Sequence, residues 1–134
     1  MSTRVNDRKQ SPIQFLATMR ELVALTWSSM KKCPKNTRFI YQTKVCDYAE
    51  EAYMHLITVN SIMVKTESDK IQKRKHLYEA LGLINSLEAL LSLIQASLDK
   101  EDKQYVSDNA WLELGKLLFT ERNLVLGVIK GNSL

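Results

Sequence analysis

The residues best suited to chemistry are four cations within six positions, Lys70, Lys73, Arg74 and Lys75. Ammonium and guanidinium groups at this density can neutralise the phosphates of a nucleic acid, whatever its sequence. Lysines in the first turns of a helix face the positive end of the helix dipole, which costs roughly a few tenths of a kcal/mol each. Helix stability therefore does not explain the cluster. The alternative interpretation is a merely solvated helix end.

Few other residues suggest catalysis. The sequence has no Gly-rich phosphate loop, no HExxH motif and no GxSxG motif, and His55 and His76 are interpreted as separate surface residues. Glu121 falls on the core-facing side of its predicted helix, where a carboxylate needs a partner or a proton. A structural ion pair or a local helix break near Thr120 and Arg122 is the favoured interpretation. We expect no enzymatic activity, no catalytic residue, no metal ligand and no cofactor.

Composition narrows the class of protein. The 134 residues suffice for one domain, with an apolar fraction of 45% and a net charge of +4 that is too mild to identify a nucleic-acid binder by itself. Cys33 and Cys46 lack the spacing of a metal knuckle or a CxxC motif, which predicts reduced thiols. The N-terminus lacks an apolar signal core, and no stretch approaches about 18 uninterrupted apolar residues. We expect a cytoplasmic protein with no membrane contact.

Four long helices must position these residues, because apolar side chains recur at steps of three and four in four stretches. Ser11 followed by Pro12 favours the first helix start, and Pro34 ends that helix. The second helix opens at Asn36 or Thr37, the third is capped by Ser68 or Asp69 and runs to about Leu98, and the last ends before Gly131. The predicted core positions are Phe15, Leu16, Met19, Leu22, Val23, Thr26, Met30, Gln42, Val45, Ala49, Ala52, Leu56, Val59, Met63, Ala110, Trp111, Leu114, Leu117, Leu118, Leu124, Val125 and Val128.

Short links between long amphipathic helices predict an all-α fold, an up-down-up-down antiparallel four-helix bundle over residues 11–130. Residues 1–10 are expected to form a flexible basic segment, and residues 131–134 a tail. In this topology, one end of the bundle holds the first turns of the first and third helices and the last turns of the second and fourth helices. We call that end the basic pole. Its cations are Arg4, Arg8, Lys9, Lys65, Lys70, Lys73, Arg74, Lys75 and Lys130.

A second apolar stripe marks the last helix. Leu112, Phe119 and Leu126 are one heptad apart and fall on the side opposite the core-facing residues. In a monomer this line would be exposed, and Gly115 beside it would permit close backbone approach. The stripe predicts a homo-oligomer, most simply a dimer or a closed ring. The alternative is a rotated or kinked helix that buries the stripe within one chain.

Three stretches resemble a known family. They are CPKNTRF at residues 33–39, similar to that family's "FPK" helix connection, the basic-to-apolar stretch of residues 73–93, and LGKLL at residues 114–118. Together with the helix pattern, they resemble the accessory variability proteins of diversity-generating retroelements, which are related to proteins encoded in 23S rRNA intervening sequences. The resemblance covers roughly residues 11–130. YAEE at residues 48–51 departs from the segment typical of the intervening-sequence branch, which favours the accessory branch.

The resemblance implies a partner and an assembly. The members of that family are barrel-like homopentamers that bind a reverse transcriptase and its RNA template during mutagenic cDNA synthesis. We therefore expect a non-enzymatic accessory factor that binds RNA or DNA, a reverse transcriptase and further copies of itself. The alternative is an oligomeric protein-interaction bundle without a nucleic-acid role, whose basic pole binds an acidic protein.

Overall fold

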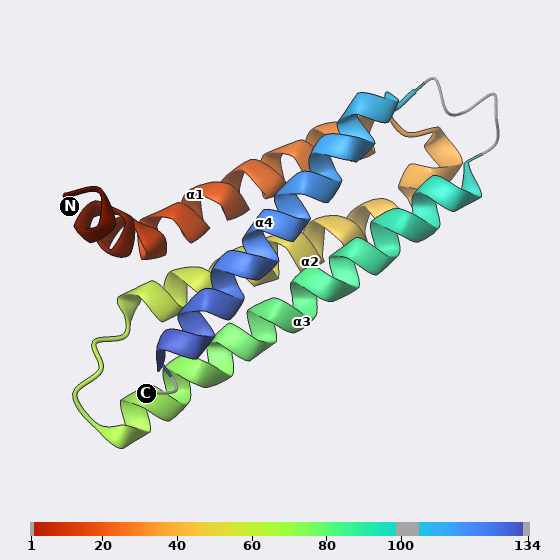
Figure 1. Cartoon of the computed structure of the whole chain (residues 1–134). Helices are drawn as coiled ribbons and strands as arrows, with labels where there is room; N and C mark the ends of the chain where they lie inside the picture. The colour runs from red at the N-terminus through yellow and green to blue at the C-terminus, as the bar shows by residue number, and fades with distance from the viewer. Residues whose placement is uncertain (1, 99–104, 133–134) are drawn as a thin grey trace.

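The computed structural model describes residues 2–98 and 105–132, with side chains described from Gln14 to Leu98 and from Tyr105 to Gly131. Within these ranges the chain is all-helical and has no strand (Figure 1). The helices are α1 (Ser2–Lys32), α2 (Lys35–Ser61), α3 (Glu67–Ser97) and α4 (Asp108–Asn132). The predicted all-α fold with four helices is confirmed.

Each helix packs against two others. α1 contacts α2 and α4, and α3 contacts the same two helices. Figure 1 shows the link between α2 and α3 at the end of the molecule where the C-terminus lies, and the link between α1 and α2 at the other end. The first turns of α3 and the last turns of α4 therefore lie at the same end.

One face of each helix supplies the core. Side chains three or four residues apart lie on the same side of a helix, so burial follows the predicted periodicity. Burial of each large aliphatic side chain contributes about 1.5–3 kcal/mol, and this core is the main source of stability. The buried residues are Phe15, Met19, Leu22, Thr26, Ser29, Met30, Cys33, Val45, Ala49, Ala52, Leu56, Val59, Leu77, Ala80, Ile84, Leu87, Leu91, Ile94, Leu98, Val106, Leu114, Leu118, Glu121, Val125 and Ile129.

Several predicted helix limits were wrong, and the last helix runs to Asn132 rather than ending before Gly131. α1 begins at Ser2 rather than Ser11, so residues 2–10 belong to the same helix. α2 ends at Ser61 because Ile62 adopts an extended conformation with φ −82° and ψ 117°. Met63 therefore lies in the link between α2 and α3 and is 73% exposed, although the sequence pattern placed it in the core.

The start of α3 is fixed by a capping box at Thr66, not by a cap at Ser68 or Asp69. The Thr66 hydroxyl accepts a hydrogen bond from the Asp69 N–H, and the Asp69 carboxylate accepts one from the N–H of Thr66 and another from that of Lys65, each at 3.1 Å. The hydrogen bond from Lys65, followed by those from Thr66, lowers the pKa of Asp69. This box places the basic cluster in the first turns of α3.

α3 is also long and apolar enough, by length and composition, to cross a membrane. The core helix of a soluble protein passes the same test, so this is weak evidence for a membrane span. Six residues of α3 are buried.

Candidate functional site

The basic cluster lies where the sequence places it. Lys70 and Lys73 are half-buried, and Arg74 and Lys75 are exposed. Among the described residues, none of the four forms an ion pair. At 100° per residue, Lys75 lies about 140° around the helix from Lys70, so the four cations span more than one face.

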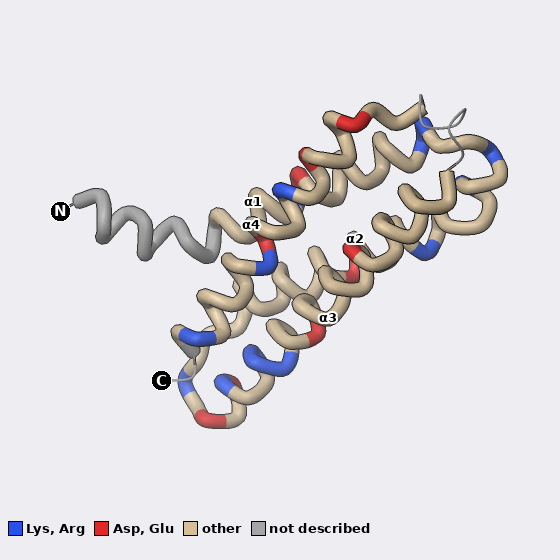
Figure 2. Tube along the Cα trace, turned by 45° about the vertical axis from the view of Figure 1, so that its right-hand side comes forward, with Lys and Arg blue, Asp and Glu red and all other residues tan. Residues whose placement is uncertain are grey.

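The basic pole is brought together in part. Lys65, in the link before α3, and Lys130, in the last turn of α4, are exposed. Figure 2 shows several basic positions at the end of the molecule where the C-terminus and the start of α3 lie. Arg4, Arg8 and Lys9 lie outside the residues whose side chains are described. The described part of the pole therefore consists of the cluster with Lys65 and Lys130.

The apolar stripe of α4 is exposed over two of its three residues. Leu112 is 56% exposed and Phe119 is 61% exposed. Leu126 is only partly exposed and packs against the core, so its predicted place on an exposed line holds only in part. The alternative, a helix rotated to bury the whole stripe, does not describe this chain.

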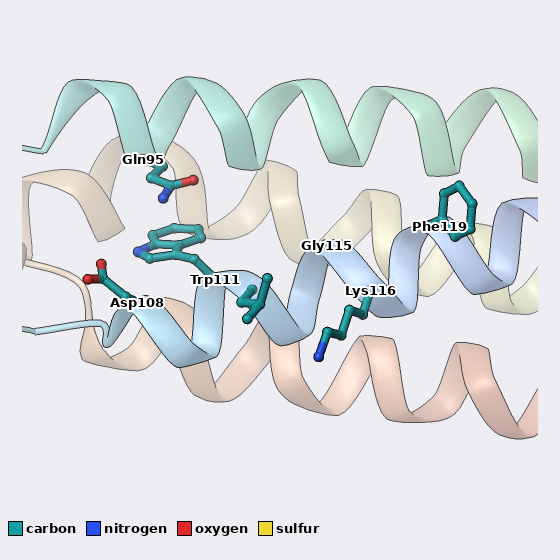
Figure 3. Close-up of a pocket in the computed structure, with 7 residues that line it drawn as sticks. Gln95, Asp108, Trp111, Gly115, Lys116 and Phe119 are labelled. Carbon is teal, nitrogen blue, oxygen red and sulfur yellow. The ribbon is translucent and has the colours of Figure 1, made fainter.

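A hollow of about 550 Å³ adjoins the stripe between α4 and α3. In Figure 3, Trp111 extends toward Gln95 of α3. A Cβ atom added to Gly115, which also lines the hollow, would have no atom within 4 Å. The surface beside Phe119 is therefore both apolar and open.

Glu121 is fully buried, and neither of its carboxylate oxygens has a hydrogen-bond partner in the described part of the chain. Burial removes water from the charged form and raises the pKa of Glu121 from 4.5 to about 8. The ion pair and the helix break that the sequence favoured are both wrong. α4 continues through residue 121, and the cation beside it, Arg122, lies 3.0 Å from Asn85 Oδ1 and 2.6 Å from Glu88 Oε1.

A polar cluster joins α2 to α3, and sequence reasoning missed it. His55 and His76 are not separate surface residues, because their Nδ1 atoms lie 2.9 Å apart. Glu79 Oε2 lies 3.2 Å from His55 Nε2. We call these three residues the histidine cluster. The expectation of no metal ligand is thereby put in question, since one donor atom from each residue lies within 4.8 Å of the other two.

One signal in the sequence could have found the histidine cluster. Only residues 62–66 separate α2 from α3, so the two helices must pack as neighbours. His55 lies two turns before the end of α2, and His76 lies in the third turn of α3. Residues at such similar distances from a short link can meet across a helix pair.

Searches of protein-family models, curated proteins and solved structures find no match to this chain. The family resemblance of the sequence therefore stays a prediction.

Proposed function

We propose that the protein is a non-enzymatic, cytoplasmic, nucleic-acid-binding accessory factor that acts as a homo-oligomer. The observation that carries the proposal is the basic cluster, four cations that form no ion pair among the described residues. Repulsion between neighbouring like charges and with the helix dipole makes the cluster unfavourable for the isolated fold. Phosphates would neutralise that charge and release bound counterions.

Oligomerisation would multiply this surface. Leu112, Phe119 and the hollow beside Gly115 present apolar area that a second copy can cover. In the proposed assembly, up-down-up-down bundles form a ring, and the resemblance suggests a pentamer. Each basic pole then repeats around the axis, so modest affinity per subunit adds up through multivalency.

The proposed protein partner is a reverse transcriptase, and the proposed nucleic acid is its RNA template or the DNA made from it. This part of the proposal rests on the family resemblance. The basic cluster supports it only by its chemistry, because cations bind phosphate without reading sequence.

A protein-interaction bundle with no nucleic-acid role is the second candidate. Phe39 is 91% exposed and Ile40 is 65% exposed near the start of α2, at the end opposite the described basic pole. Two adjacent exposed apolar residues are a common feature of protein contacts.

The nucleic-acid proposal is tested by charge removal with a matched control. The test variant changes Lys70, Lys73, Arg74 and Lys75 to Gln, and the control makes the same change at exposed lysines of the other end, Lys31, Lys32, Lys35 and Lys44. Binding of labelled single-stranded RNA and duplex DNA is measured across a salt titration. Each lost phosphate contact should lower the salt slope by about 0.7 to 0.9. If the parent and the test variant bind equally well, the nucleic-acid proposal is rejected and the protein-interaction bundle is favoured.

Assembly is tested separately. Phe119→Lys should reduce the mass measured by light scattering toward that of a monomer, with helicity unchanged by circular dichroism. Met54→Lys, at an exposed apolar residue of α2 outside the stripe, should leave the mass unchanged. A parent protein that is monomeric at tens of micromolar, above the dissociation constants of stable assemblies, would reject the homo-oligomer.

A further inference from the structure

The histidine cluster combines ligand types that suit a transition metal ion. Imidazole nitrogen is a common ligand of zinc, copper and nickel, and a nearby carboxylate supplies negative charge. His55 comes from α2, whereas His76 and Glu79 come from α3, one turn apart. The His55 side chain is 27% exposed and the Glu79 side chain 41% exposed, so an ion from solvent can reach the cluster.

We propose that His55 and His76 bind a divalent transition metal ion of the zinc class through their Nδ1 atoms, with Glu79 as the positioning carboxylate. The Nδ1 atoms are 2.9 Å apart. Two nitrogens that each lie 2.0–2.1 Å from a tetrahedral zinc are separated by about 3.3 Å. The two nitrogens therefore need to part by only a few tenths of an ångström, and the rings need to turn so that both lone pairs converge on the ion. Water completes the coordination.

The two rings meet through their nitrogen atoms and do not stack. The ring centroids are 5.1 Å apart and the ring planes are tilted by 40°, so the contact is made by the two nitrogen atoms. Two neutral imidazoles can share this contact only if one nitrogen carries the proton and the other accepts it. When the His76 proton moves from Nδ1 to Nε2, a metal ion can take its place and bind both Nδ1 lone pairs.

Glu79 fixes which nitrogen of His55 is available. Its carboxylate lies against Nε2, and an N–H at that atom leaves the lone pair on Nδ1. A carboxylate that accepts the other ring N–H is the usual companion of a metal-bound histidine, and its loss typically lowers metal affinity by about 10–100-fold. Lys73, one turn before His76, places a positive charge on the same helix and opposes cation binding. Glu79 offsets that charge.

A metal ion at this position would join α2 to α3. Because it binds the folded chain and not the separated helices, it should raise the midpoint of thermal unfolding as its concentration rises. This proposal does not depend on the proposed nucleic-acid function.

The test uses the full chain with Cys33 and Cys46 changed to Ala, which removes the thiols as competing zinc ligands. The chain has only two histidines, so zinc binding that needs imidazole can be assigned to this cluster. We expect one zinc per chain by calorimetric titration and loss of that binding in His55→Ala and in His76→Ala. Glu79→Gln should weaken it about 10–100-fold. Glu67→Gln, at an exposed carboxylate of the same helix, should leave it unchanged.

A second measurement does not depend on how the variants fold. In the cysteine-free chain labelled with 15N at histidine, zinc should shift both Nδ1 signals, with His55 keeping its Nε2 proton and His76 moving its proton from Nδ1 to Nε2. Shifted Nδ1 signals with one-to-one binding support the proposal. Absence of binding at millimolar zinc, or binding that leaves the Nδ1 signals in place, overturns it.

Discussion

Glu79 and Glu121 are two carboxylates on neighbouring helices with opposite surroundings. Glu79 lies on α3 at the rim of the fold, where it is half exposed and pairs with His55. Glu121 lies on α4 with no exposed surface and no hydrogen-bond partner among the described residues. The surroundings of a carboxylate thus differ in two respects, whether it is buried and whether it has a partner. The sequence alone does not distinguish the two.

The partner of a polar side chain depends on its direction around the helix. Glu121 and Arg122 are adjacent, yet successive residues point about 100° apart. Glu121 faces the apolar core, whereas Arg122 reaches Asn85 and Glu88 of α3. Two neighbouring residues on one helix thus differ completely, because Glu121 has no partner and Arg122 has partners on α3.

The largest expected effect is the pH dependence caused by Glu121. Burial raises the pKa of its carboxyl from 4.5 to about 8, so the folded chain holds a proton that the unfolded chain releases between those values. Its contribution to stability is therefore fully present below about pH 4.5 and is lost as the pH rises toward 8. The loss is about 1.4 kcal/mol per pH unit, or on the order of 5 kcal/mol in all. Urea unfolding across this range measures it.

The control makes the same substitution at an exposed carboxylate of the same helix. Glu121→Gln removes the titrating group and should flatten this part of the pH profile, whereas Glu113→Gln should leave the slope in place. A parent profile that does not fall between pH 5 and 8 would show that Glu121 finds a partner or water when ionised.

An intermediate effect is expected at Arg122. Its contacts with Asn85 and Glu88 are partly exposed, with 25% of the Arg122 side chain and 43% of the Glu88 side chain accessible, so solvent screens the charge. Arg122→Met should lower the free energy of unfolding by about 1 kcal/mol. A double-mutant cycle with Glu88→Gln isolates the ion pair. A coupling energy of zero would mean that Arg122 acts only through Asn85 or its packing.

The smallest effect is expected at Glu79 in metal-free protein. Its contact with His55 is 3.2 Å long and half exposed, so Glu79→Gln in the presence of a chelator should change the free energy of unfolding by less than about 1 kcal/mol. Chemical denaturation at neutral pH checks this value. If the free energy of unfolding fell by several kcal/mol, the histidine cluster would be a structural element of the metal-free fold. Glu79 and Glu121 would then no longer differ in their importance for stability.

Much of the fold could be predicted from local pattern. The apolar periodicity of residues such as Phe15, Leu56 and Leu118 predicts both the helices and the faces they bury, since an amphipathic helix has one favourable way to leave water. The residues at which the helices begin and end were harder to predict from the sequence. Met63 continues the apolar pattern, yet the chain turns at Ile62 and the Thr66–Asp69 capping box starts the next helix.

The sequence by itself determined four helices, their core faces and the crowding of Lys70, Lys73, Arg74 and Lys75, because each of these depends on residues close together along the chain. Only the tertiary structure decided what the isolated polar residues do. His55 meets His76 because α2 and α3 pack side by side, and Glu121 stays without a partner because Arg122 points to another helix. The short link shows that α2 and α3 are neighbours, but which side chains meet depends on the rotation and register of each helix, and these are set by the packing of the whole core.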